Sequence, residues 1–179
     1  DQRRRSCQTV MALIIERLAG FIAPVLCHMA EDIWQNLPYP VQETSVFQRG
    51  WPTVPSAWRN DTLSAPMQQL RELRAAVNKV LEDCRGRQEL GASLEAAVRI
   101  DARSPELQAA LSWLNDNGDP DVDGLRDWLL VSQLQLGGEP WAEVLASQED
   151  ATAVIDVSRA CGTKCDRCWH YEADVGQHP

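Results

Sequence analysis

The sequence predicts a mainly α protein, in which a helical bundle is followed by a small α+β unit and then by a cysteine-rich tail. Three observations predict this order. Apolar residues recur every three or four positions through most of the first 85 residues, which is the period of a helix buried on one side. Short β-branched stretches alternate with shorter helical segments between residues 98 and 160. Three of the six cysteines lie within residues 161–179.

The first predicted element runs from Val10 to Trp34, with a kink or break near Ala23 because Pro24 removes a backbone donor. An aperiodic loop follows, and we expect Trp51 and Trp58 to wrap around it.

The second long helix is predicted from Pro66 to Arg85, with Ser64 as its N-cap and Gly86 as its C′ residue. A short helix opens at Ser104-Pro105 and stops at Asn117-Gly118. The remaining elements are a final helix and three strands, predicted at Leu125–Leu130, Val98–Ala102, Val131–Leu136 and Val154–Ala160. We therefore expect three parts: a bundle at 1–90, an α+β unit at 91–160 and a tail at 161–179.

The composition excludes several classes of protein. With 179 residues, 44% of them hydrophobic and 24% charged, the chain is long enough for one core and is not disordered. Its longest apolar stretch, Leu18–Ala30, is interrupted by His28 and is shorter than the roughly 20 residues of a spanning helix, so we expect no membrane partner. No export signal opens the chain, and six cysteines then favour the reducing cytoplasm over a disulfide framework.

The net charge of −9 is concentrated in one segment. Residues 106–150 hold ten acidic residues and the single base Arg126, so the rest of the chain is balanced. Phosphates respond to the local field, within a Debye length of about 8 Å, and not to the sum over a protein. An acidic total therefore does not exclude an RNA partner.

The sharpest local signal is Cys165-Asp166-Arg167-Cys168. A Cys-x-x-Cys turn places two sulfurs where both can bind Zn²⁺, and a structural zinc site has four ligands. Either Cys161, His170 and His178 supply the remaining ligands of an irregular site, or a second pair lies beyond Pro179. The competing interpretations are coincidence and a redox motif, and the latter would need a βαβ context that this segment lacks.

Other motifs are weaker. Residues 119–124, Asp-Pro-Asp-Val-Asp-Gly, imitate the start of a calcium loop, but Leu130 occupies the position of the final glutamate, so we expect a solvated acidic turn. No nucleophile signature or phosphate-binding loop is present, and the chain does not look catalytic. We expect Cys7, Cys27 and Cys84 to pack in the core.

Basic and aromatic residues meet around the Cys-x-x-Cys turn, at Lys164, Arg167, Trp169 and Tyr171. Such a cluster suits unpaired RNA, because an exposed indole stacks on a base while a guanidinium binds a phosphate or a base edge. The alternative is that Trp169 packs beneath the turn as a miniature core.

Several strings together resemble one family. Residues 18–34, which include Ala23-Pro24 and Ala30-Glu31-Asp32-Ile33-Trp34, resemble a helix of the anticodon-binding domain of class I aminoacyl-tRNA synthetases. Ser45-Val46 with Trp51-Pro52 resembles the passage that follows that helix, and Leu81–Arg85 with Leu90–Ala96 resembles the stretch beyond the bundle. Lys164-Cys165-Asp166-Arg167-Cys168-Trp169-His170-Tyr171 resembles the opening of the zinc-binding module of the bacterial-type isoleucine–tRNA ligases.

The resemblance implies that this is a C-terminal, tRNA-recognising part of such a ligase, with its zinc module cut short. Its parent would activate isoleucine with ATP and magnesium and charge tRNA(Ile), using N-terminal catalytic and editing domains that have no counterpart in this sequence. Cys165 and Cys168 would be the first half of a four-cysteine zinc site, and Arg167 and Trp169 would lie against the anticodon arm. The alternatives are a free-standing helical adaptor that binds protein and has a zinc-stabilised tail, or the same region of a valine-type tRNA ligase.

Overall fold

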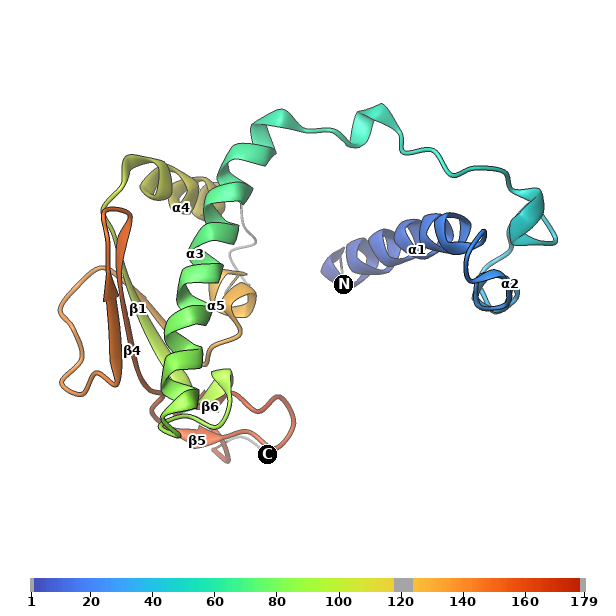
Figure 1. Cartoon of the computed structure of the whole chain (residues 1–179). Coiled ribbons are helices and arrows are strands. Elements are labelled where there is room, and N and C mark those ends of the chain that lie inside the picture. Colours follow the sequence, from blue (N-terminus) through green and yellow to red (C-terminus); the bar gives the residue numbers. More distant parts are fainter. Residues whose placement is uncertain (1, 118–123, 178–179) are drawn as a thin grey trace. The chain divides into compact units, whose positions relative to one another are not determined.

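A computed structural model describes residues 2–117 and 124–177 of the chain (Figure 1). This part holds five α-helices, a four-stranded mixed sheet and a two-stranded hairpin, which confirms a mainly α fold with a small mixed sheet. Its contacts divide it into two compact units, residues 1–59 and 60–179, which are described separately. No helix among the described residues is both long enough and apolar enough to cross a membrane.

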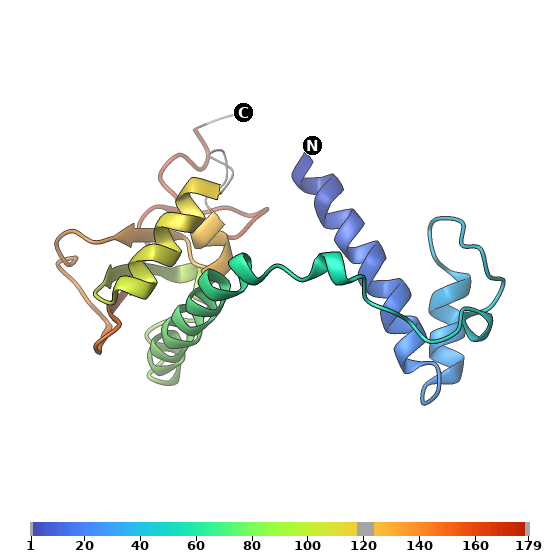
Figure 2. The same ribbon diagram turned by 90° about the horizontal axis from the view of Figure 1, so that it is seen from above.

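The first unit is built on two helices, α1 (Gln2–Ile22) and α2 (Cys27–Gln35). The helix breaks at Pro24 as predicted, and α2 folds back beside α1 instead of continuing in line (Figure 2). Small residues allow this close approach, and the buried core of the unit consists of Ala19, Ala23, Ala30, Trp34 and Val46.

The predicted apolar face of this segment is buried only in part: Ile22 and Ile33 pack against the core, whereas its other large residues are exposed. Met11, Ile14 and Leu18 follow the predicted spacing, yet all three are exposed, with 57% of Ile14 accessible. The reason is that α1 packs on α2 through its alanines, a second and smaller apolar face. Cys7 and Cys27 are also exposed and not core residues, whereas Cys84 is fully buried as predicted.

The loop after α2 is fastened by Glu31. Ser45 Oγ and the Val46 N–H donate to Glu31 Oε2 at 2.8 and 3.1 Å, and Gln35 Nε2 donates to Glu31 Oε1 at 2.7 Å. These hydrogen bonds, led by the one from Gln35, lower the pKa of the Glu31 carboxyl because they favour its charged form. Val46 is thereby held in the core at the start of a 3₁₀ turn (Val46–Gln48).

The tryptophans of this loop lie against α1 but are not buried by it. The ring of Trp51 contacts Phe21 edge-on at 5.3 Å, and the guanidinium of Arg17 lies 4.4 Å from the ring centroid of Trp58. Trp51 is nevertheless 67% exposed, and Trp58, at the end of a 3₁₀ turn (Ser56–Trp58), is exposed as well. The two rings therefore contact α1, but they stay exposed and do not wrap the loop as predicted.

The second unit opens with α3 (Asp61–Gly86), which begins five residues before the prediction. Its N-cap is Asn60, whose Oδ1 accepts from the Leu63 N–H at 3.1 Å, so Ser64 is not the cap. Pro66 is the sixth residue of the helix, and because proline has no N–H, the hydrogen bond from this position to the Thr62 carbonyl is missing. Gly86 is the last helical residue rather than the one after it.

A sheet of order β2-β1-β4-β3 packs on α3. β1 (Ala96–Ala102) pairs in parallel with β2 (Gln133–Leu136) and antiparallel with β4 (Ala153–Arg159), which pairs with β3 (Ala146–Glu149). α3, α4 (Pro105–Asn117) and α5 (Gly124–Leu129) share one core with the inner sheet face (Figure 1). Ser104 Oγ accepts from the Leu107 N–H at 3.2 Å, which confirms the predicted cap of α4.

The outer face of the sheet carries a buried ion pair. Arg99 Nε lies 3.1 Å from Asp156 Oδ2, and both side chains are 7% exposed. Ser147 Oγ donates to the other carboxylate oxygen at 2.6 Å, so the group joins β1, β4 and β3. The calcium-like motif at residues 119–124 lies, except for Gly124, outside the described residues.

Candidate zinc and nucleic-acid site

The Cys-x-x-Cys motif lies in the turn of a small hairpin, formed by β5 (Thr163–Lys164) and β6 (Tyr171–Glu172). Two backbone hydrogen bonds close the turn: the Cys165 N–H donates to the His170 carbonyl at 2.8 Å, and the Trp169 N–H donates to the Cys165 carbonyl at 2.9 Å. The hairpin therefore folds the four residues of the motif into a compact loop.

The Cys165 sulfur lies where backbone donors favour its thiolate. The N–H groups of Cys168 and Arg167 donate to it, with the Cys168 thiol also in reach, and these contacts lower the pKa of Cys165. A thiolate is the form of cysteine that binds metal. The two sulfurs and their donor environment thus fit half of a tetrahedral zinc site.

Among the described residues, neither Cys161 nor His170 joins this pair. Within residues 2–117 and 124–177, no group of three or more His, Cys, Asp or Glu side chains could hold a metal ion. Cys161 is exposed, and its backbone is bonded to Gln133. His170 contributes its carbonyl to the turn, while His178 lies outside the described residues.

The predicted RNA contacts surround the turn. Lys164 and Arg167 are exposed, and Tyr171 is half-buried at the base of the hairpin. The indole of Trp169 is 61% exposed, so it does not form a core beneath the loop. Its backbone has a φ of 65°, in the left-handed region that bulky residues rarely occupy. The turn presents an aromatic ring and two cations to solvent.

Residues that attach the hairpin to the sheet were not anticipated from the sequence. Gln133 exchanges two hydrogen bonds with the backbone of Cys161, and Ser132 Oγ accepts from the Tyr171 N–H at 2.8 Å. The sequence around Gln133 and Ser132 predicts a strand. It does not show that the side chains of these residues bond to backbone groups 28 and 39 positions later in the chain.

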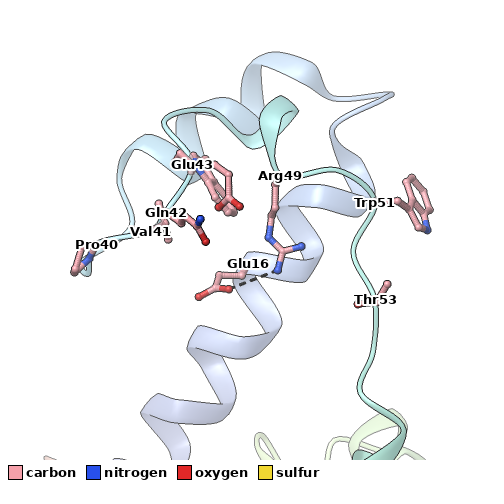
Figure 3. A pocket seen from close by; sticks show the side chains of 9 residues that line it. Glu16, Pro40, Val41, Gln42, Glu43, Arg49, Trp51 and Thr53 are labelled. Atoms are coloured by element: carbon pink, nitrogen blue, oxygen red, sulfur yellow. Dashed lines mark hydrogen bonds and ion pairs between the residues drawn. The ribbon is translucent and has the colours of Figure 1, made fainter.

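The first unit contains a separate pocket of about 460 Å³ between α1 and the loop after α2. Figure 3 shows Arg49 reaching toward Glu16, with 3.7 Å between guanidinium nitrogen and carboxylate oxygen, while Trp51 points away. None of the RNA-contact residues predicted from the sequence lines this pocket.

Comparison with known proteins identifies the family. A model described as the anticodon-binding domain of tRNA ligase matches residues 1–100. The chain belongs to this family. A second model, described as a zinc finger found in FPG and IleRS, matches residues 162–179, the segment that contains Cys165 and Cys168.

Among the relatives of this chain, the isoleucine–tRNA ligase of Parasynechococcus marenigrum is 92% identical over 179 residues, and that of Prochlorococcus marinus is 74% identical over 178. The ligase of a Synechococcus species is 71% identical over 178 residues. The matches cover 99–100% of this chain but only 18% of each relative. The chain thus matches the isoleucine–tRNA ligases as the sequence indicated, and neither a free-standing adaptor nor a valine-type ligase is favoured.

Proposed function

We propose that this chain is the tRNA-recognising region of an isoleucine–tRNA ligase. The whole enzyme activates isoleucine with ATP and magnesium and transfers it to tRNA(Ile) in the cytoplasm, while this region docks the anticodon arm and carries out no chemistry. The observation that carries the proposal is that Trp169 and Arg167 are exposed on the Cys-x-x-Cys hairpin. This hairpin lies in the segment that matches the zinc-finger model, and residues 1–100 of the same chain match the anticodon-binding domain.

Zinc is the proposed brace of this hairpin. Cys165 and Cys168 would supply two thiolates, and a second pair of ligands would come from polypeptide outside this chain. A structural zinc contributes folding energy and crosslinks its ligands, which would hold the turn in the conformation that exposes Trp169.

Recognition would combine stacking with charge. The indole of Trp169 would stack on an unpaired base, an interaction worth about 1–3 kcal/mol. Arg167 and Lys164 would bind phosphates or a base edge, and the half-buried Tyr171 would support the base of the hairpin. The phosphate contacts position the RNA, whereas the contacts with the bases specify it.

The rest of the ligase polypeptide is the proposed partner of α1. Met11, Ile14, Leu18 and Phe21 are spaced by three and four residues and form an exposed stripe, which is the pattern of a helix that packs against another element. We propose that the catalytic and editing part of the same polypeptide covers this stripe and so fixes the recognition region to the catalytic region.

Replacing Trp169 tests the function. In the full-length ligase, Trp169→Ala should raise the KM for tRNA by roughly 5- to 150-fold, because a stacking contact of about 1–3 kcal/mol is lost. Isoleucine-dependent ATP–pyrophosphate exchange, measured without tRNA, should remain at the wild-type rate. Trp169→Phe retains a ring and should recover part of the affinity.

The matched control is Asp166→Ala, in the same exposed turn. This variant removes a negative charge and should leave tRNA binding unchanged or strengthen it. Equal losses of charging and exchange in Trp169→Ala would overturn the proposal and assign Trp169 a folding role.

A further inference from the structure

The β5–β6 hairpin is too small to fix its own orientation. Each strand has two residues, and the register consists of two pairs, Thr163 with Glu172 and Lys164 with Tyr171. An isolated two-stranded hairpin is at best marginally stable in water. The direction in which Trp169 points therefore depends on the contacts between the hairpin and the rest of residues 60–179.

Gln133 holds the chain where it enters the hairpin. Its Nε2 donates to the Cys161 carbonyl at 2.9 Å, and its Oε1 accepts from the Cys161 N–H at 3.0 Å. This double exchange reproduces, with a side-chain amide, the bonding of a hydrogen-bonded pair in an antiparallel ladder. Gln133 is itself held by its pairing with Ala97 in β1, so it links the hairpin to the sheet.

Ser132 and Arg126 hold the chain where it leaves the hairpin. The hydroxyl of Ser132, which is fully buried, accepts from the Tyr171 N–H and donates to the Leu94 carbonyl. Arg126 Nη1 bonds to the Ser132 carbonyl at 3.2 Å and to Glu172 Oε1 at 2.8 Å. This exit side is more buried than the entry side at Cys161, which is exposed.

Gly162 brings the two sides together. Its φ of +103° is accessible to glycine, and a Cβ at this position would lie 2.6 Å from the carbonyl carbon and oxygen of Glu172. The entering and leaving chains are thus in direct contact at the base of the hairpin. With the exit side fixed at Ser132, the bonds from Gln133 to Cys161 decide how far the hairpin can pivot.

We propose that Gln133 is a positioning residue for tRNA recognition: its two hydrogen bonds to Cys161 set the orientation of the hairpin and therefore of the Trp169 indole. The inference rests on the proposed function of the hairpin as an RNA contact. Without these bonds, the hairpin samples several orientations, and tRNA must select one of them, which lowers the apparent affinity. Gln133 acts without touching the RNA.

The test uses the full-length ligase with its zinc. Gln133→Ala should raise the KM for tRNA about tenfold, because two neutral hydrogen bonds are lost, while kcat, ATP–pyrophosphate exchange and zinc content stay at wild-type values. The matched control is Gln135→Ala. Gln135 lies on the same strand, but its amide bonds to the Gly137 and Glu139 carbonyls and not to the hairpin. The KM of Gln135→Ala for tRNA should therefore equal that of the wild type.

A combined variant separates this inference from the function on which it rests. If Gln133 acts through the RNA contacts of the hairpin, then Gln133→Ala should have little further effect in a background that already carries Trp169→Ala, Arg167→Ala and Lys164→Ala. A full further effect in that background, a KM for Gln133→Ala equal to that for Gln135→Ala, or loss of zinc from Gln133→Ala would each overturn the positioning role. An unchanged KM in Trp169→Ala alone would instead overturn the RNA-contact function of the hairpin.

Discussion

At the scale of single residues, Glu31 shows how one side chain can order a loop. Its carboxylate accepts hydrogen bonds from Gln35, Ser45 and the Val46 backbone, and these hold the pKa of Glu31 below its ordinary value of 4.5. A group with a lowered folded-state pKa stabilises the fold above its unfolded-state pKa, and this contribution is lost as the pH falls through the folded-state value.

This linkage predicts a pH effect that Glu31→Gln removes. The thermal midpoint of the wild-type chain should fall as the pH drops below about 4.5, the ordinary value of this carboxyl, and the variant should show a shallower fall there. Circular dichroism melts between pH 6 and pH 3 measure both. Parallel curves for the two proteins below pH 4.5 would show that Glu31 contributes nothing to the acid dependence.

Local residue chemistry was the most predictable part of the sequence. The break at Pro24 and the cap at Ser104 follow from bonding rules that act within one turn, and both are confirmed. The cap of α3 was misplaced because Asn60 and Ser64 are both good capping residues, and only the structure shows whose oxygen meets a free N–H.

At the scale of elements, periodicity identified the helices but not their buried faces. The stripe on α1 that includes Ile14 has the spacing of a buried face, yet the helix packs through Ala19 and Ala23. β3 escaped prediction because Ala-Ser-Gln-Glu has little intrinsic preference for a strand and is held by pairing with β4. The buried face of α1 and the formation of β3 thus depend on contacts with segments distant in the sequence, which local patterns do not reveal.

The α1 stripe yields a prediction that compares two contexts. Ile14→Gln should change the thermal midpoint of the isolated chain little, because Ile14 is already exposed there. In the full-length ligase, the same change should cost about 1.5–3 kcal/mol, the value of burying such a side chain. Urea denaturation of both proteins measures the difference.

Val54→Gln is the control, because Val54 is similarly exposed but lies outside the helix. It should be neutral in both contexts. If Ile14→Gln is neutral in the full-length ligase as well, then the rest of the polypeptide does not cover this stripe.

At the scale of the whole molecule, the chain accounts for 18% of the length of its relatives, and its described residues contain the two cysteines of the predicted zinc motif. The Cys-x-x-Cys pair can be predicted as zinc ligands from the sequence because two cysteines at this spacing can bind one metal ion; its role stays a prediction. Its attachment to Gln133 could not be predicted, because that contact joins segments 28 residues apart.

We expect the isolated chain to bind zinc weakly, since two thiolates do not close a tetrahedral shell. Competition with a chromophoric chelator should give an affinity weaker than micromolar for this chain and a tight, stoichiometric site in the full-length ligase. Sub-micromolar zinc in the isolated chain that Cys161→Ala abolishes would instead show that Cys161 completes the site.

The left-handed backbone at Trp169 means that the hairpin carries its largest ring where the chain tolerates side chains least. Such a conformation costs a residue with a Cβ about 1 kcal/mol or more, and glycine almost nothing. At position 169, the stability of the turn thus favours glycine, whereas the proposed RNA contact needs an aromatic ring. Trp169→Gly removes the indole and relieves the backbone strain, so the thermal midpoint should stay the same or rise while the tRNA affinity falls.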